Sequence, residues 1–210
     1  MARGLFITFE GGEGAGKSTQ VTALADRLAA TGREVVRTRE PGGSPGAEAI
    51  RALLVTGGVN RWSPVTETLL MNAARRDHLE RVIEPALARG AVVVCDRFAD
   101  STRAYQGAGG GAPDALIGEL ERAVVGATRP DLTLLLDLDP AVGLARSGAR
   151  QTDAHRFEQH DLAYHRRLRA AFLSLADAEP GRFAIIDANA PCEAVTAAVW
   201  AAASERLSVS

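Results

Sequence analysis

Apolar residues along the chain fall into short continuous runs, separated by longer stretches in which they recur at helical spacing. The short runs are rich in Val, Ile, Leu and Phe and predict β-strands at residues 5–9, 34–38, 91–96, 132–139 and 183–187. Several runs are apolar at nearly every position, which is typical of strands that are covered on both faces. The pattern therefore predicts a buried sheet with helices on each side.

The longer stretches between the runs predict helices at residues 17–31, 44–55, 64–89, 112–126, 158–178 and 191–206. Proline follows Ser63 and Asp139, and each of these pairs is a common start signal for a helix. Strands and helices alternate, so we expect a three-layer α/β/α fold with a mostly parallel sheet of about five strands. The sequence has no repeat or interdomain linker, which favours one domain over residues 1–210, with the glycine-rich residues 107–113 as a flexible loop inside it.

The composition narrows the class of protein without selecting one. The chain has 210 residues, 46% of them hydrophobic, and a formal net charge of −2, so its charge gives no reason to expect nucleic acid or a membrane as a partner. The sequence contains no apolar run long enough to span a membrane and no signal-peptide pattern after Met1. Cys95 and Cys192 do not form a CxxC motif, and a reduced cytoplasmic protein is the simplest interpretation.

The most specific motif in the chain follows the first predicted strand. Residues 9–20 read FEGGEGAGKSTQ and contain the phosphate-binding pattern G-x-x-x-x-G-K-[ST] between a strand and a helix. Glycines let backbone N–H groups approach phosphate oxygens closely, and the helix adds the positive end of its dipole. Lys17 is the only lysine among the 24 Lys and Arg residues, and its compact ammonium suits the space between the β- and γ-phosphates better than a planar guanidinium. We expect ATP to bind at Gly11, Gly12, Glu13, Gly14, Ala15, Gly16, Lys17, Ser18 and Thr19.

Several classes of protein share this loop, and the rest of the chain separates them. GTP switches usually read the base with an N-K-x-D motif, which cannot occur in a chain whose only lysine is Lys17. The chain is also short for a motor or a transporter ATPase. A small kinase needs further cationic groups to hold the acceptor, together with a basic lid that excludes water. Such groups occur in TREPGG (38–43), AARRDH (73–78) and DRFADSTRAYQG (96–107).

Taken together, these motifs resemble those of the thymidylate kinase family. TREPGG, the Asp96-Arg97 pair, STRAYQG (101–107) and RPDLTLLLDLDP (129–140) are similar to that family's motifs in order and spacing, over about Leu5 to Asp187. The resemblance implies a P-loop NTPase-like fold and the transfer of phosphate from ATP, with Mg²⁺, to dTMP. It also implies a homodimer and a cis peptide bond before Pro41.

The resemblance implies particular roles around the acceptor phosphate and the metal. Arg97 corresponds to the arginine that clamps the acceptor phosphate, and Glu13 to the acidic residue that accepts a hydrogen bond from the sugar 3′-hydroxyl. Asp96 corresponds to the carboxylate that holds Mg²⁺ through water, and Ser18 of the phosphate-binding loop offers its hydroxyl to the same ion. Asp96 and Ser18 are thus the expected metal ligands.

The resemblance also implies how the nucleoside is held. Arg75 corresponds to an arginine that reaches the thymine carbonyl, and Tyr105 to an aromatic residue that packs under the deoxyribose. Met71 is a departure, because many members stack the thymine on phenylalanine there, although a polarizable thioether can also lie on a ring face. The expected substrate-binding residues are Glu13, Arg39, Met71, Arg75, Arg97, Ser101, Thr102, Tyr105 and Gln106.

Residues 145–158, ARSGARQTDAHRFE, are interpreted as a short lid. Guanidinium groups that close over the reacting phosphates stabilise the charge that spreads over their oxygens during transfer. The phosphate-binding loop has no arginine after Glu13, and in the resembled family such a loop goes with lid-supplied arginines, among which we favour Arg150. The expected catalytic residues are Lys17, Arg97, Arg150, Arg146, Arg156 and Glu13.

Two further expectations concern the histidines and the alternative functions. His155, His160 and His165 are spaced by five residues, which turns successive side chains about 140° apart on a helix and predicts surface residues rather than metal ligands. Another nucleoside monophosphate kinase and a regulatory module that binds ATP without phosphate transfer both stay open. The acceptor-clamping residues argue against the second, since a protein that only binds ATP does not need them.

Overall fold

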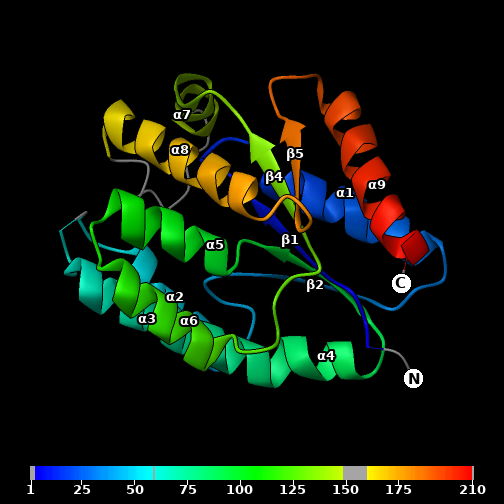
Figure 1. The fold of residues 1–210 in the computed structure, drawn as a ribbon, viewed down its shortest axis with the longest axis horizontal. Helices are drawn as coiled ribbons and strands as arrows, with labels where there is room; N and C mark the ends of the chain where they lie inside the picture. The colour runs from blue at the N-terminus through cyan, green and yellow to red at the C-terminus, as the bar shows by residue number, and fades with distance from the viewer. Residues whose placement is uncertain (1–2, 59, 149–159, 210) are drawn as a thin grey trace.

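The computed structural model describes residues 3–58, 60–148 and 160–209, and a parallel sheet of five strands forms its centre (Figure 1). The strands lie in the order β2–β3–β1–β4–β5, with bounds Val35–Arg39, Val92–Asp96, Phe6–Glu10, Leu132–Asp137 and Phe183–Asp187. All adjacent strands pair in parallel, and Phe9 lies beside both Asp96 and Leu134 in register. The expected α/β fold and all predicted strands are therefore confirmed, with bounds that differ by at most two residues.

Helices cover both faces of this sheet. Helix α1 (Lys17–Ala30) packs with α9 (Cys192–Val209) on one face, where Val21, Leu24 and Leu28 meet the apolar side chains of β1 and β4. The other helical segments are α2 (Pro45–Val55), α3 (Pro64–His78), η1 (Leu79–Ile83), α4 (Glu84–Ala88), α5 (Ala99–Thr102), η2 (Arg103–Gly109), α6 (Asp114–Val124), α7 (Pro140–Gly148) and α8 (Leu162–Ala178). The opposite face of the sheet packs against η1 and α4 at one end and against α8 and η2 at the other.

The helical segment α5–η2 is the main feature that the sequence pattern does not predict. Residues 99–109 form a continuous helical stretch with π-type turns, and Gly107–Gly109 complete it instead of belonging to a loop. A Cβ atom on Gly109 would lie 2.7 Å from the ring of Tyr164, so glycine lets η2 approach α8 closely. The expected loop over 107–113 is thus wrong for its first three residues, because glycine serves helix packing there.

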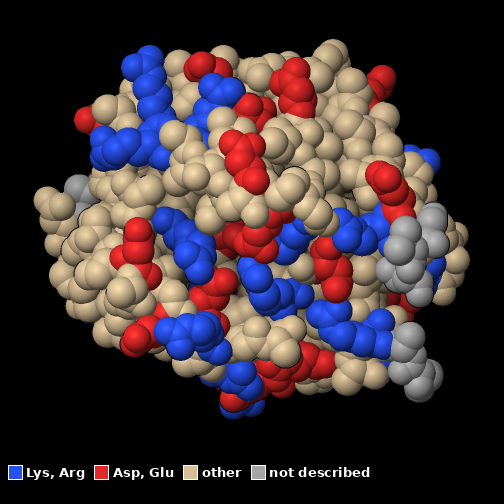
Figure 2. Space-filling view, viewed as in Figure 1, with Lys and Arg blue, Asp and Glu red and all other residues tan. Residues whose placement is uncertain are grey.

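The surface has no dominant sign of charge on the face in Figure 2, where basic side chains are interspersed with acidic ones over most of the area. This mixture agrees with the formal net charge of −2. Among the described helices, none combines the length and the hydropathy that crossing a bilayer requires.

Candidate active site

The phosphate-binding loop joins β1 to α1, and its backbone requires glycine. Gly11, Gly14 and Gly16 have φ angles of 132°, 68° and 86°, which glycine adopts far more readily than other residues. A Cβ atom on Gly11 would lie 2.4 Å from the carbonyl oxygen of Leu136 in β4, so the loop lies directly against the neighbouring strand. The motif forms the loop that its sequence predicts, at the carboxyl edge of the sheet.

The loop also touches α7 through a pair of glycines. A Cβ atom on Gly14 would lie 2.1 Å from the carbonyl oxygen of Gly143, and a Cβ atom on Gly143 would lie 2.3 Å from that of Glu13. The contact joins two backbones, so neither glycine has room for a side chain. This close approach gives a physical reason for glycine, and not arginine, directly after Glu13.

The side chain of Lys17 curls back over the loop. Its Nζ donates to the carbonyl oxygens of Gly11 at 3.1 Å and Gly12 at 2.7 Å. Burial and the positive charge of Arg97 lower the pKa of Lys17 to about 8, against the opposing attraction of Glu13. The ammonium is therefore buried within the loop, beside the carbonyl oxygens of Gly11 and Gly12.

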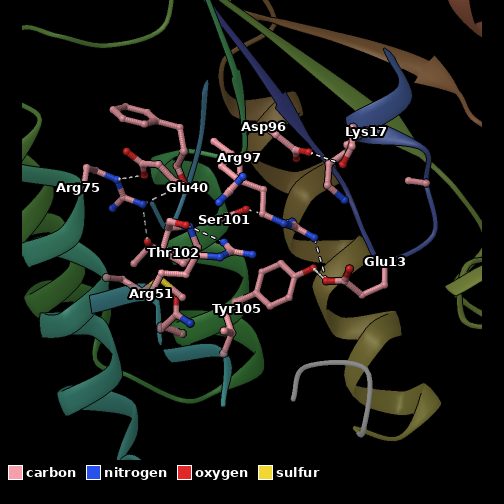
Figure 3. Close-up of a pocket in the computed structure, with 18 of the residues that line it drawn as sticks. Glu13, Lys17, Glu40, Arg51, Arg75, Asp96, Arg97, Ser101, Thr102 and Tyr105 are labelled. Atoms are coloured by element: carbon pink, nitrogen blue, oxygen red, sulfur yellow. Dashed lines mark hydrogen bonds and ion pairs between the residues drawn. The ribbon is translucent and has the colours of Figure 1, made fainter. Parts of the chain in front are cut away.

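A cavity of about 340 Å³ opens beside the loop, and Figure 3 shows side chains from the loop, β3 and η2 converging on it. All nine residues of the expected substrate-binding set line this cavity: Glu13, Arg39, Met71, Arg75, Arg97, Ser101, Thr102, Tyr105 and Gln106. Among the described lining residues, five are cationic and three are acidic: Lys17, Arg39, Arg51, Arg75 and Arg97 against Glu13, Glu40 and Asp96. This excess of positive charge suits phosphate-bearing ligands.

Arg97 follows β3 and extends toward Glu13 (Figure 3). Its φ angle is 70°, and among the residues that the structure describes it is the only non-glycine residue with a positive φ. Nη2 donates to Glu13 Oε1 at 2.8 Å, while Nη1 donates to the Gly11 carbonyl oxygen at 3.0 Å and to Ser101 Oγ at 3.2 Å. Burial opposes the charge, but Tyr105 and Glu13 more than offset it and raise the pKa of Arg97. The guanidinium is thus charged and fixed from three sides.

Glu13 is held in its ionised form. The Tyr105 hydroxyl donates to its Oε1 at 2.7 Å. Burial alone would raise the pKa of Glu13, but the charges of Arg97 and Lys17, together with this hydrogen bond, lower it to about 2. An ionised carboxylate can only accept hydrogen bonds, so Glu13 is suited to accept one from a hydroxyl group of a ligand.

Ser18 and Asp96 meet where α1 begins and β3 ends. The Ser18 hydroxyl donates to Asp96 Oδ2 at 2.7 Å, and both residues line the cavity. A hydroxyl and a carboxylate are hard oxygen donors of the kind that Mg²⁺ prefers, and Mg²⁺ usually keeps several waters and substrate phosphate oxygens as its other ligands. The two residues therefore fit a magnesium ion that would be completed by phosphates and water.

Arg75 lies in a buried polar network at the far end of the cavity. Its side chain is 3% exposed, its Nε donates to Glu40 Oε2 at 2.7 Å, and its Nη2 donates to Thr102 Oγ1 at 3.0 Å. The other oxygen of Glu40 lies 3.0 Å from His78 Nδ1. The Glu40–Pro41 peptide bond is cis, as expected. Nothing in the local sequence singles out Glu40, because its partners lie 35 and 38 residues away.

Arg51 is a second lining residue that the sequence pattern does not identify. It comes from α2, and its Nη1 donates to the Pro41 carbonyl oxygen at 2.6 Å. Burial and the charge of Arg39 lower the pKa of Arg51. On sequence spacing alone, Arg51 is indistinguishable from an arginine on the solvent side of a helix. Arg39 itself is exposed and pairs with Glu48 at 3.0 Å.

Only residues 145–148 of the predicted lid are among the residues that the structure describes. Residues 145–148 form the end of α7, where the exposed Arg146 donates to the Ala188 carbonyl oxygen at 3.0 Å. Arg146 is not among the described residues that line the cavity. Arg150 and Arg156 lie outside the described residues, so the lid roles stay predictions.

His165 corrects one expectation. It is buried on α8 (4% exposed) beside Glu13, whereas the spacing of the histidines predicted a surface position. The angle between successive side chains on a helix gives their relative directions, but it does not show which direction faces the core. Of the other two, His160 is partly buried and His155 lies outside the described residues.

Comparison with known proteins identifies the family of the chain. A family model for thymidylate kinase matches residues 9–199. The chain belongs to the thymidylate kinase family. Thymidylate kinases of Caulobacter vibrioides and Ruegeria pomeroyi are 65% and 56% identical to it. The first match covers 99% of both chains, and the second covers 93% of this chain and 92% of the relative.

The fold agrees with a solved thymidylate kinase structure. The crystal structure of the thymidylate kinase from Ehrlichia chaffeensis matches with a TM-score of 0.79 and 32% sequence identity, covering 97% of this chain and 98% of that chain. The resemblance in the motifs and the expected P-loop NTPase-like fold are thus confirmed.

Proposed function

We propose that the chain carries out the thymidylate kinase reaction in the cavity beside the phosphate-binding loop. As a member of this family it phosphorylates dTMP to dTDP, with ATP as the phosphoryl donor. The observation that supports this location is the convergence of Lys17 and Arg97, which come from two neighbouring strand ends, on one cavity. Phosphoryl transfer depends mainly on positioning and on stabilising charge, and this arrangement suits both.

The donor phosphates lie along residues 11–18 in this proposal. Backbone N–H groups of the loop and the first turn of α1 bind their oxygens, and Lys17 exchanges its carbonyl partners for the β- and γ-phosphates. Ser18 and Asp96 would hold Mg²⁺. When bound, the ion supplies positive charge that neutralises the phosphate oxygens.

The acceptor nucleotide occupies the rest of the cavity. Arg97 binds the dTMP phosphate, and the ionised Glu13 accepts a hydrogen bond from the 3′-hydroxyl. Tyr105 packs under the deoxyribose, and its ring also lies beneath the Arg97 guanidinium, at 4.8 Å from Cζ to the ring centroid. Arg75 contacts the thymine carbonyl, and Met71 lies against the ring. The remaining polar contacts to the acceptor come from Arg39, Ser101, Thr102 and Gln106.

Three further features belong to the same proposal. Arg150, with Arg146 and Arg156, closes over the reacting phosphates from the lid. The enzyme works as a homodimer in the cytoplasm.

A coupled ADP-release assay tests the proposal directly. Purified protein with ATP and Mg²⁺ is offered dTMP, dUMP, UMP, CMP, AMP and GMP in turn, and turnover is expected to favour dTMP clearly. Lys17→Ala should abolish turnover, and Arg97→Ala should chiefly raise the KM for dTMP, because each removes one phosphate-binding charge. Preference for another monophosphate would point to a different nucleoside monophosphate kinase, and ATP binding without any turnover would point to a regulatory module.

A further inference from the structure

Glu10 is a buried carboxylate that the proposed mechanism does not use. It is the last residue of β1, directly before the phosphate-binding loop, and it is 0% exposed. Its Oε1 accepts from the backbone N–H of Phe98 at 2.8 Å and from that of Ser101 at 3.2 Å. Its Oε2 accepts from the Ser101 hydroxyl at 2.6 Å. A single side chain thus ties the end of β1 to the turn that follows β3.

The turn that Glu10 holds contains the strained residue Arg97. A φ angle of 70° is disfavoured for any residue with a Cβ atom, so neighbouring contacts must maintain it. The Arg97 N–H donates to the Phe9 carbonyl oxygen at 2.9 Å, and the next N–H, of Phe98, donates to Glu10. The end of β1 therefore holds the backbone on both sides of the strained conformation.

Glu10 also reaches the Arg97 side chain through Ser101. The Ser101 hydroxyl donates its proton to Glu10, which leaves its oxygen lone pairs for the Arg97 Nη1 donor at 3.2 Å. Figure 3 shows the Arg97 side chain next to Ser101 and directed toward Glu13. Glu10 is not among the described residues that line the cavity, so its effect on a ligand passes through the residues that it holds, Phe98 and Ser101, which do line it.

The charge of Arg97 also affects the ionisation of Glu10, which is a second, electrostatic link between the two side chains. Burial and the neighbouring Asp100 raise the pKa of Glu10 to about 7, while Arg97 and the hydrogen bonds from Ser101 and Phe98 oppose the rise. Asp100 itself forms a bidentate ion pair with Arg182, with nitrogen–oxygen distances of 2.7 and 2.9 Å. Among the groups that favour the ionised form of Glu10, Arg97 has the largest effect.

We propose that Glu10 is a positioning residue for the acceptor phosphate: it maintains the strained backbone of Arg97 and, through the Ser101 hydroxyl, aims the Arg97 guanidinium. The proposal rests on the proposed role of Arg97 in binding the dTMP phosphate. It deepens that role, because it assigns the orientation of the clamp to a residue one strand away.

Glu10→Gln tests the proposal with little change in size. The amide oxygen can still accept from both backbone N–H groups, but the negative charge and the acceptor for the Ser101 hydroxyl are lost. We expect the KM for dTMP to rise about tenfold, because the loss of one charge-assisted hydrogen bond typically changes an affinity by about that factor. The KM for ATP should change less than about twofold. Thr8→Val is the matched control: Thr8 is equally buried on β1 and its hydroxyl bonds only to Thr133 in the described contacts, at 2.9 Å, so neither KM should change.

A double-mutant cycle distinguishes action through Arg97 from general damage. In the Arg97→Ala background, Glu10→Gln should have no further effect on the KM for dTMP. The same fold-increase in both backgrounds, or an equal rise in the KM for ATP, would overturn the proposal. If Arg97→Ala alone leaves the KM for dTMP unchanged, the proposed role of Arg97 fails; if it raises the KM and Glu10→Gln does not, only the proposal for Glu10 fails.

Ser101→Ala keeps the test decisive if Glu10→Gln does not fold. This variant retains the Glu10 carboxylate and removes the hydroxyl between it and Arg97. We expect a rise in the KM for dTMP that is clearly smaller in the Arg97→Ala background, where only the direct contact of Ser101 with the acceptor is left to lose. An equal fold-increase in both backgrounds would mean that Ser101 acts on the substrate alone, and it would contradict the proposed path from Glu10 to the guanidinium.

Discussion

Acid should destabilise the protein partly through Glu13, and the size of this effect follows from the structure. The pKa of Glu13 is about 2 in the folded protein, against an ordinary value of 4.5. Above pH 4.5 the group is ionised in both the folded and the unfolded state, and its stabilising interactions are fully present. As the pH falls from 4.5 toward 2, the unfolded chain takes up a proton that the folded protein does not, so the free energy of unfolding decreases. At pH 3 the decrease is about 2 kcal/mol, from 1.36 kcal/mol for each of 1.5 pH units.

Urea unfolding of the wild type and of Glu13→Gln at pH 5, 4 and 3 measures this effect. Glutamine does not titrate, so the difference between the two free energies of unfolding should shrink by about 2 kcal/mol between pH 5 and pH 3. Taking the difference cancels the titration of carboxylates that both proteins share. A difference that stays constant with pH would refute the reasoning, because it would mean that Arg97 and Lys17 do not hold the pKa of Glu13 low.

Two further substitutions test the packing of the loop and of the buried network. Gly143→Ala should weaken ATP binding at least about tenfold in calorimetric titration, because its Cβ atom would fall 2.3 Å from the backbone of the phosphate-binding loop. Gly118→Ala in α6 is the control: its Cβ atom meets nothing within 4 Å, so ATP affinity should stay unchanged and the helix should gain about 0.5–1 kcal/mol. Equal ATP affinities for the two variants would contradict the contact. Glu40→Gln should lower the free energy of unfolding by about 3–5 kcal/mol, because it leaves Arg75 as an unpaired buried charge. Glu48→Gln, at an exposed pair, should change it by less than about 1 kcal/mol in the same urea experiment, and similar losses for both would count against the network.

Local sequence patterns predict the strands of the fold and their parallel arrangement. The apolar runs identify the strands because both faces of the sheet are covered, and their alternation with helices determines the parallel arrangement. The α5–η2 segment escapes prediction because its buried face uses Ala104, Tyr105 and glycines instead of a periodic set of large apolar residues. The sequence around Gly109 is typical of a loop, and only the close approach of the Tyr164 ring explains why glycine occurs there in a helical segment.

The candidate site divides in the same way. The phosphate-binding loop is a contiguous motif, and Asp96 ends a recognisable strand that Arg97 follows, so their positions are predictable from the sequence alone. Glu10 is different, since FITFE reads as an ordinary strand whose final carboxylate would face solvent. Its burial depends on residues 88 and 91 positions later, which fold over it only because of the unusual turn at Arg97. The local spacing of residues in the sequence does not predict such tertiary contacts.

A crystal structure of the protein with dTMP and a non-hydrolysable ATP analogue would test most directly whether two nucleotides meet in this cavity. We expect the Arg97 guanidinium to lie within about 3 Å of dTMP phosphate oxygens, and the Lys17 ammonium to lie at the same distance from the β- and γ-phosphates. A dTMP phosphate bound outside the cavity, with Arg97 still joined only to Glu13, Gly11 and Ser101, would contradict the proposed mechanism.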